Sequence, residues 1–284
     1  MDNKIKNLKE YFKKREDAVM AFLFGSRVKG EEFLYEDSDW DIAVYFRSKN
    51  GRLEWDRNID YPQRSEVLSD LAKILETNRI DLIVLNHAYP LIINAALSGI
   101  PLAIKNRRLW LEFSLLLSNE AMDFAKTSRE YFEIYWRSAS LIPEDAIALE
   151  ERLVFLDSEL KNFMEKYSSI TWEEYQKDDM KRKVLERTCE ILINAAIDIS
   201  KIILASSKKS RPHSYDEILL NAAFNLSFDG EKAKTFSQFA PLRNILAHEY
   251  LDYRWKEIKP FLESAPSIFP DFIDSSRKFL EENK

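Results

Sequence analysis

The stretch VMAFLFGS at residues 19–26, followed by SDWDIAV at residues 38–44, decides the fold of the first part of this 284-residue chain. The first stretch is an apolar run that ends at a Gly-Ser pair, which is typical of a buried strand followed by a tight turn. The second, continued to residue 46, alternates with a period of two and predicts another strand. A third apolar run at residues 80–85 adds a further buried strand.

The remaining elements divide the chain into two parts. Helices are predicted at 3–16 and 62–76, and a short last strand is predicted at 100–104. From residue 109 onward the pattern predicts no strand, and helical spacing is found at 110–137, 145–167, 175–206, 214–224, 231–250 and 254–282, with breaks at Pro143, 206–212, Gly230 and around Pro260. We therefore expect an α+β domain with a small mixed sheet at 1–108, followed by an all-α bundle at 109–284, in which 109–144 is a connecting helix.

The charge balance and the single cysteine exclude several kinds of protein. The chain has 42 basic and 48 acidic residues, so its net charge is −6. An acidic surface repels phosphate backbones, and any contact with nucleic acid must therefore be local. One cysteine, Cys189, excludes an intrachain disulfide or a cysteine-rich zinc site, and its apolar surroundings predict a core position. Without an apolar leader or a membrane-length apolar run, we expect a cytoplasmic protein with no membrane contact.

Three aspartates and the Gly-Ser pair form the first chemical pattern. Asp39 and Asp41 are two apart on a predicted strand, so their carboxylates should point the same way. Paired carboxylates together with substrate phosphates are the ligands that Mg²⁺ favours. Asp81, at the start of the neighbouring strand, would complete the site and could deprotonate an incoming hydroxyl. Gly25 allows close approach of a phosphate, which the hydroxyl and amide of Ser26 can hold.

This pattern resembles the minimal nucleotidyltransferase family of the polymerase-β-like superfamily. The matching stretches are GSRVKG at 25–30, SDWDIAV at 38–44 and DLIVL at 81–85. The loop between the Gly-Ser pair and the aspartates is slightly longer than in the family, and counting the family's spacing would select Asp37 and Asp39. We prefer Asp39 and Asp41, because Asp41 leads directly into the strand.

The resemblance carries expectations about substrate and cofactor. It implies an ATP-dependent transferase that uses Mg²⁺, with Asp39, Asp41 and Asp81 as metal ligands. It also implies that Arg27 or Lys29 lies near the phosphates, beside the Gly-Ser turn.

The sequence PLRNILAHEY at 241–250 is the second chemical pattern. Histidine can move protons at a ribose oxygen near neutral pH, and arginine can stabilise the charge that grows on phosphorus. The segment resembles the HEPN family, specifically its HepT-like toxins, whose motif Arg-x4-His-x-Tyr is matched by Arg243, His248 and Tyr250. Asn244 is the polar residue that commonly follows the arginine. The resemblance implies a metal-independent ribonuclease acting on RNA, with a site shared across a homodimer of the helical domain.

Together the two resemblances imply a self-regulating protein. In toxin–antitoxin pairs of these families, the transferase attaches AMP to the tyrosine of the HEPN motif, which here is Tyr250. Bulk and negative charge two residues from His248 would block RNA entry and repel its phosphates. Fusion would raise the local concentration of acceptor near donor. We therefore expect a fused toxin–antitoxin-type protein that is its own acceptor, with modification either within one chain or between the chains of a dimer.

Other interpretations of the two halves stay open. The chain would also suit a small-molecule nucleotidyltransferase, such as one that modifies aminoglycosides, although that chemistry has no need of the HEPN motif. Alternatively, the helical half is a non-catalytic module for dimerisation or nucleotide sensing. The basic loop at 208–213 either contacts RNA or is only solvated, and the aromatic run at 131–136 has helical spacing that predicts packing between the domains.

Overall fold

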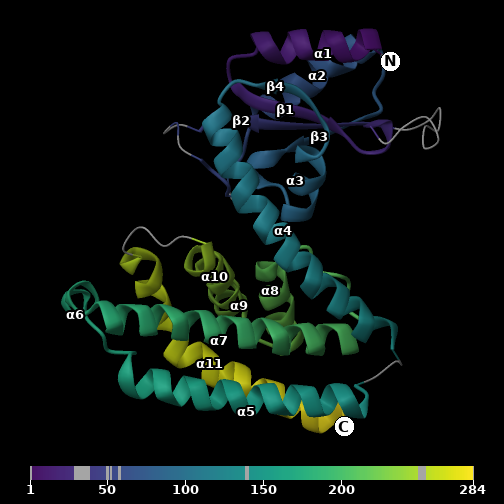
Figure 1. Cartoon of the computed structure of the whole chain (residues 1–284). Coiled ribbons are helices and arrows are strands. Elements are labelled where there is room, and N and C mark those ends of the chain that lie inside the picture. The colour runs from purple at the N-terminus through teal and green to yellow at the C-terminus, as the bar shows by residue number, and fades with distance from the viewer. Residues whose placement is uncertain are drawn as a thin grey trace. The chain divides into compact units, whose positions relative to one another are not determined.

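The computed structural model describes residues 2–28, 39–48, 51, 53–56, 59–137, 141–248 and 254–283. The chain forms two compact units, Met1–Asp123 and Phe124–Lys284 (Figure 1). The division falls inside helix α4 (Arg107–Trp136), and the expected role of 109–144 as a connecting helix stays a prediction. The domain boundary at residue 108 stays a prediction. In the described residues, no helix combines the length and the apolar character that crossing a membrane requires.

The first unit contains the mixed sheet predicted from the sequence. Its strands are β1 (Ala18–Phe24), β2 (Trp40–Phe46), β3 (Ile80–Val84) and β4 (Ile100–Ile104), in the order β3-β2-β1-β4. Strand β1 runs antiparallel to both β2 and β4, whereas β2 and β3 are parallel. The helices of this unit are α1 (Asp2–Lys14), α2 (Gln63–Leu75), α3 (Pro90–Leu97) and the start of α4, with short 3₁₀ turns η1 (Ser26–Val28) and η3 (Leu85–His87).

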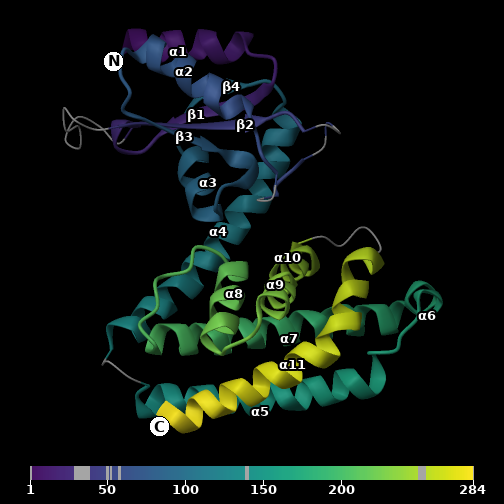
Figure 2. The same ribbon diagram turned by 180° about the vertical axis from the view of Figure 1, so that it is seen from behind.

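Helices cover both faces of the sheet. Helices α1 and α2 lie on one side and α3 lies on the other (Figures 1 and 2). Leu23 and Ile42 face Leu8 and Leu71 on the α1–α2 side. The opposite face packs against α3 and the first turns of α4, and its buried members include Phe22, Ala43, Tyr45, Ile93 and Phe113. The strands therefore read as continuous apolar runs, because both faces are buried. The alternating residues of β2 point in turn into the core on each face of the sheet, and not alternately into a core and solvent.

The described residues of the second unit form helices joined by loops and contain no strand, as predicted. Its elements after α4 are α5 (Pro143–Lys166), α6 (Trp172–Lys177), α7 (Asp179–Ser206), α8 (Tyr215–Asn225), α9 (Gly230–Ser237), α10 (Phe239–His248) and α11 (Trp255–Asn283). Helix α7 is central and packs against α5, α8, α10 and α11. Its predicted apolar face is confirmed, because Leu185, Leu192, Ala196, Ile199 and Ile203 are all fully buried.

Three details of the helical prediction are wrong. The helix expected at 175–206 is divided, since Asp178 ends α6 and its side chain caps α7 by accepting from the amides of Met180 and Lys181. The helix expected at 231–250 is also divided, into α9 and α10. Conversely, the break expected around Pro260 is absent, and α11 continues through it. A long apolar face of α11, including Phe261 and Phe269, is buried, and this burial offsets the missing backbone hydrogen bonds of its prolines.

Candidate functional site

The turn after β1 holds the carboxylate of Asp41. Gly25 has a φ of +78°, a conformation that glycine adopts without steric cost. A Cβ built on Gly25 would lie 1.8 Å from Oδ2 of Asp41, so the carboxylate occupies the space that a side chain would need. The register of β1 and β2 creates this contact by pairing Phe24 with Asp41. The backbone N–H of Ser26 donates to the same carboxylate.

Asp81 is the direct cross-strand partner of Asp41, in the parallel pair of β2 and β3. The pKa of Asp41 is raised above its ordinary value, first by burial and then by the negative charges of Asp81 and Asp39. Arg27 and the Ser26 amide partly counteract this rise. The three aspartates are therefore close enough to act on one another, and the negative charge around Asp41 is only partly compensated.

Asp39 lies just outside the strand on which the sequence placed it. Strand β2 begins at Trp40, whose amide makes the first ladder bond, 3.0 Å from the carbonyl of Arg79. Arg27 bridges this point, because its Nε donates to the Asp39 carbonyl at 3.0 Å and its guanidinium lies 4.7 Å from the ring centre of Trp40. Arg27 thus connects the Gly-Ser turn to the start of β2. Lys29 lies outside the described residues.

The donor set around Asp41 suits a hard divalent cation. Within the described part of the chain, no three His, Cys, Asp or Glu side chains form a ready-made group that could hold a metal ion. Magnesium does not require such a cage, since it is usually bound by one or two carboxylates and completes its shell with phosphate oxygens and water. The pKa of Asp41 is raised by burial and by neighbouring negative charges, and a bound cation would stabilise the ionised form of this carboxylate.

Arg243 on α10 is held by two neighbouring helices. Its Nε donates to Oδ1 of Asn194 on α7 at 3.0 Å, and its Nη1 donates to Oδ1 of Asn244 at 3.4 Å. Its guanidinium lies 5.0 Å from the ring centre of Tyr215, the first residue of α8. Sequence reasoning missed Asn194 and Tyr215. The signal for Asn194 was a polar residue inside the apolar run of α7, but nothing local connects it to Arg243.

The other motif residues are only partly described. His248 is the last residue of α10, so the helix carries Arg243 and His248 five positions apart, but the structure does not describe the His248 side chain. Tyr250 lies outside the described residues. The roles expected of His248 in RNA cleavage and of Tyr250 as the AMP acceptor therefore stay predictions.

A buried polar cluster that the sequence did not reveal follows the motif. Arg254 is 5% exposed, and its Nη1 donates to the Leu246 carbonyl in the last turn of α10 at 3.4 Å and to Oε2 of Glu186 on α7 at 3.5 Å. The Tyr175 hydroxyl donates to Oε1 of Glu186 at 2.5 Å and accepts from the backbone amide of Arg254 at 3.1 Å. The cluster thus ties the motif-bearing end of α10 to α6, α7 and α11.

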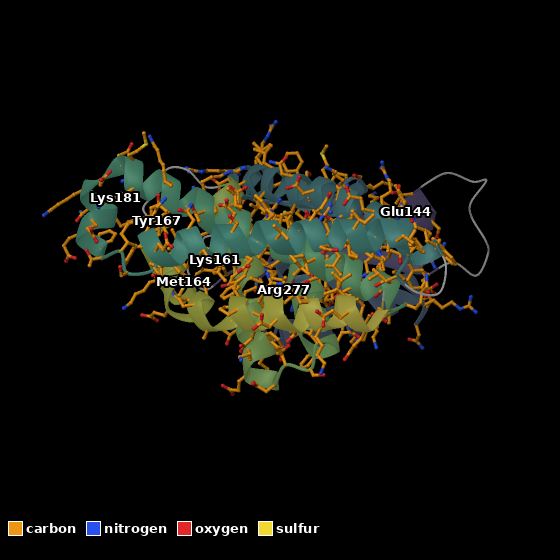
Figure 3. The ribbon with its side chains drawn as sticks, turned by 90° about the horizontal axis from the view of Figure 1, so that it is seen from below. Glu144, Lys161, Met164, Tyr167, Lys181 and Arg277 are labelled. Atoms are coloured by element: carbon orange, nitrogen blue, oxygen red, sulfur yellow. The ribbon has the colours of Figure 1, made fainter. Side chains whose placement is uncertain are left out.

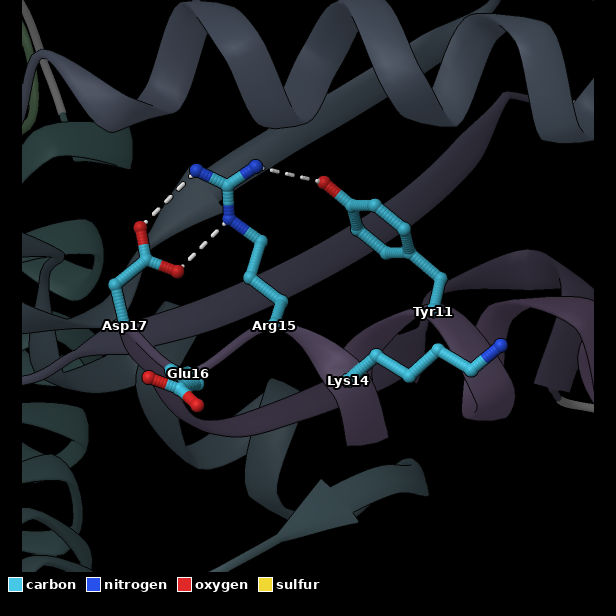
Figure 4. Close-up of a pocket in the computed structure, with 5 residues that line it drawn as sticks. All are labelled: Tyr11, Lys14, Arg15, Glu16 and Asp17. Carbon is cyan, nitrogen blue, oxygen red and sulfur yellow. Dashed lines mark hydrogen bonds and ion pairs between the residues drawn. The ribbon is translucent and has the colours of Figure 1, made fainter.

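Three open cavities are lined by residues outside the Asp41 and Arg243 sites. One of about 470 Å³ lies before β1, where Arg15 bridges Tyr11 and Asp17 (Figure 4). Gly25 is at the other end of β1, so this cavity is separate from the Asp41 site. A second, of about 370 Å³, lies between α5 and α11, where Figure 3 labels Lys161, Met164 and Arg277. A third, of about 590 Å³, surrounds the junction of α6 and α7.

The mixed-sheet unit with its Gly-Ser turn and aspartates, followed by the helical unit that carries Arg243, suits a nucleotidyltransferase-type domain joined to a helical domain of a ribonuclease family. Comparison with known families agrees, since residues 6–108 match the model Polymerase beta, Nucleotidyltransferase, and residues 156–274 match the model Ribonuclease HepT-like. The chain therefore carries a polymerase-β nucleotidyltransferase domain followed by a HepT-like HEPN domain.

Two related proteins are similar to parts of the chain. The tRNA nuclease HepT of Aphanizomenon flos-aquae (strain 2012/KM1/D3) is 24% identical over 143 residues, which are 49% of this chain and 97% of that protein. A chain in a crystal structure of a mutant of the toxin–antitoxin MntA–HepT is 19% identical, with a TM-score of 0.36, and the match covers 47% of this chain and 96% of that chain.

Proposed function

We propose that this protein is a fused toxin–antitoxin-type enzyme whose first domain transfers AMP from ATP to Tyr250 and thereby silences a ribonuclease in its second domain. The observation that carries the proposal is the seating of the Asp41 carboxylate against the Gly25–Ser26 turn, with Asp81 as its partner on β3. This arrangement presents acidic oxygens beside a backbone that can approach a phosphate closely.

In the transfer, each residue has a defined task. The Ser26 hydroxyl and the turn amides bind phosphate, and Arg27 lies beside them. Asp41, Asp39 and Asp81 would hold Mg²⁺, which when bound neutralises the triphosphate and orients it for in-line attack. Asp81, the more exposed strand carboxylate, accepts the proton of the Tyr250 hydroxyl. The tyrosine oxygen then forms a bond to the α-phosphorus, and pyrophosphate leaves.

In the proposed ribonuclease reaction, Arg243 acts through its positive charge. The ribose 2′-oxygen attacks the adjacent phosphorus, the 5′-oxygen leaves, and the products are a 2′,3′-cyclic phosphate and a 5′-hydroxyl. Arg243 stabilises the charge on phosphorus, and His248 transfers a proton to or from one of the two oxygens. Because one similar protein is a tRNA nuclease, tRNA is the first RNA to test. We also propose a homodimer through the helical domain, working in the cytoplasm, where ATP and RNA meet.

Incubation of the purified chain with Mg²⁺ and ATP, followed by intact mass measurement, tests the transfer. Each AMP adds about 329 Da, and peptide mapping should place it on Tyr250. The Tyr250→Phe and Asp41→Asn variants should gain no mass. Labelling of an added aminoglycoside instead of the protein would replace this proposal with the small-molecule transferase. Absence of any transfer would favour a non-catalytic module.

A separate assay tests the ribonuclease and its silencing. Unmodified protein should cleave tRNA without added metal, and Arg243→Ala and His248→Ala should each abolish cleavage. Protein that carries AMP should cleave far more slowly. Equal cleavage by modified and unmodified protein would contradict the silencing while leaving both catalytic assignments intact.

A further inference from the structure

The loop between α7 and α8 is fixed against the end of α4. Lys208 donates to the carbonyls of Tyr135 and Arg137, the latter at 2.9 Å. Carbonyls in the last turn of a helix have no partner within the helix, so Lys208 satisfies them. The Tyr131 hydroxyl also donates to the Lys209 carbonyl at 2.7 Å. The basic loop singled out in the sequence is therefore a built part of the helical unit.

Aromatic rings and cations alternate on this surface. Trp136 is 78% exposed and meets the edge of Tyr135 at a centroid distance of 5.4 Å. The guanidinium of Arg211 lies 5.3 Å from the ring centre of Phe132, and its Nε is buried without a hydrogen-bond partner among the described residues. Within the helical unit Tyr131 is buried and the ring of Trp136 is exposed, and the expected packing of the aromatic run between domains stays a prediction.

The loop is also a local exception to the acidic character of the chain. Residues 207–213 contain three cations, a histidine and no acid, while the net charge of the chain is −6. Lys209 is exposed, and it forms no ion pair with the carboxylates that the structure describes. Arg137, by contrast with Lys209, forms an ion pair, because its Nη1 is 2.6 Å from Oδ1 of Asp145. The acids nearest in sequence, Asp216 and Glu217, lie beyond the loop in the first turn of α8, where Glu217 accepts from the His213 amide.

A largely buried face of α4 fixes the spacing between this surface and Arg243. Tyr215, which lies under the Arg243 guanidinium, contacts Phe124 edge to face and Thr127 through its hydroxyl at 3.4 Å. Positions 124, 127, 131 and 135 recur at helical spacing, so they share a face. From residue 124 to residue 136 a helix rises about 18 Å, on the order of five nucleotides at ~3.4 Å each.

We propose that Trp136, Lys209 and Arg211, here called the loop patch, bind single-stranded RNA that flanks the phosphate at Arg243. The exposed indole stacks on a base, and the two cations bind neighbouring phosphates. Stacking accepts any base, and the pair of cations provides local positive charge in a chain whose net charge is negative. This inference rests on the proposed ribonuclease and names the part of its substrate that the motif does not reach.

Binding of a fluorescein-labelled single-stranded RNA by the full chain tests the loop patch. The protein must be unmodified, which intact mass verifies. Trp136→Ala should weaken binding roughly 5- to 100-fold, the range for loss of one stacked base, and Trp136→Phe should restore most of it. Lys209→Ala should reduce the slope of log affinity against log salt by about 0.7, and Arg211→Ala should do the same. Phe155→Ala and Lys161→Ala remove an exposed ring and an exposed cation from α5 and should change nothing.

Cleavage kinetics separate a binding role from a structural one. Trp136→Ala should raise KM for a long RNA with little change in kcat, and it should leave cleavage of a dinucleotide unaltered because that substrate cannot reach the patch. Wild-type affinity in both Trp136→Ala and Lys209→Ala would overturn the loop patch, even if Arg243→Ala still abolishes cleavage. If the wild-type chain neither binds nor cleaves RNA, the ribonuclease proposal fails, and the loop patch fails with it.

Discussion

The Asp41 carboxylate occupies the position of the missing side chain at Gly25, with Oδ2 only 1.8 Å from where a Cβ would stand. Gly25→Ala should therefore displace the carboxylate as well as strain a backbone with a φ of +78°. We expect a loss of AMP transfer of at least about 100-fold, because a displacement of an ångström at a reacting group has that order of effect. Steady-state transfer assays with ATP measure it.

Gly51 provides the matched control for this substitution. Its φ is +66°, so alanine meets a similar backbone penalty, but none of the described residues has an atom within 4 Å of its Cβ position. Gly51→Ala should destabilise the protein by about 1 kcal/mol and leave transfer unchanged. Equal losses of transfer in the two variants would show that backbone strain, and not the carboxylate, explains the effect.

Asp41→Asn should raise thermal stability in the absence of metal. The pKa of Asp41 is raised in the folded state, so folding is favoured by its protonated form, and its contribution to stability is lost as pH rises above the ordinary value of 3.8. Asparagine removes this penalty. The Tm of Asp41→Asn should exceed that of the wild type by an amount that grows as the pH rises above about 4 and levels off once Asp41 is ionised in the folded state.

Asp274→Asn is the control, because the Asp274 side chain is 77% exposed. Removing this exposed charge should change the Tm only slightly at pH 7. Adding Mg²⁺ with ATP should stabilise the wild type more than Asp41→Asn, since only the wild type keeps the carboxylate ligand. A Tm for Asp41→Asn below that of the wild type at pH 7 would contradict the charge argument.

The ring of Tyr215 should orient Arg243. Tyr215→Leu removes the aromatic face that lies 5.0 Å from the guanidinium, and we expect kcat for RNA cleavage to fall about tenfold or more. Tyr215→Phe keeps the face and removes the hydroxyl that contacts Thr127, so its kcat should stay near the wild-type value. Similar kcat values for the two variants would exclude a positioning role for the ring.

Asn194 should contribute through its hydrogen bond to Arg243. Asn194→Leu keeps a similar volume but removes the oxygen that accepts from Nε at 3.0 Å. A hydrogen bond to a charged group contributes about 1.5–3 kcal/mol, which corresponds to a 10- to 100-fold loss of kcat if it is needed in the transition state. AMP transfer, which belongs to the other domain, is the internal control and should not change.

Arg254→Met should destabilise the helical unit strongly. It leaves Glu186 without its cationic partner in a buried cluster, and breaking such a pair costs about 3–5 kcal/mol. Urea unfolding measures this loss. Arg108→Ala removes an exposed pair with Glu112 and should have no measurable effect. If Arg254→Met lowers the free energy of unfolding no more than Arg108→Ala does, Arg254 does not stabilise the helical unit.

Local patterns in the sequence predicted much of the fold. The apolar runs at 19–24 and 80–85 predicted two strands of the sheet, and the spacing of Leu185, Leu192 and Ile203 predicted a buried helical face. The core position of Cys189 followed from its neighbours, and burial raises the pKa of its thiol. These features succeed because periodicity and residue type act over a few positions along the chain.

Long-range contacts explain what the sequence left open. Helix α3 was not predicted, and α11 continues through Pro260 because its apolar face is buried by other helices. The partners of Arg243 come from 49 positions away in the case of Asn194, and Arg254 contacts Glu186 across 68. Separations of this size leave no trace in local spacing.

The sequence by itself determined which residue types were present for the chemistry: the Gly-Ser pair, the three aspartates and the motif that begins at Arg243. Only the tertiary structure decided how they meet. Strand register placed Asp41 against Gly25 and opposite Asp81, and it left Asp39 just outside β2. The physical reason is that residue types are fixed along the chain, whereas the register of strands and the docking of helices follow from burying two sets of side chains at once.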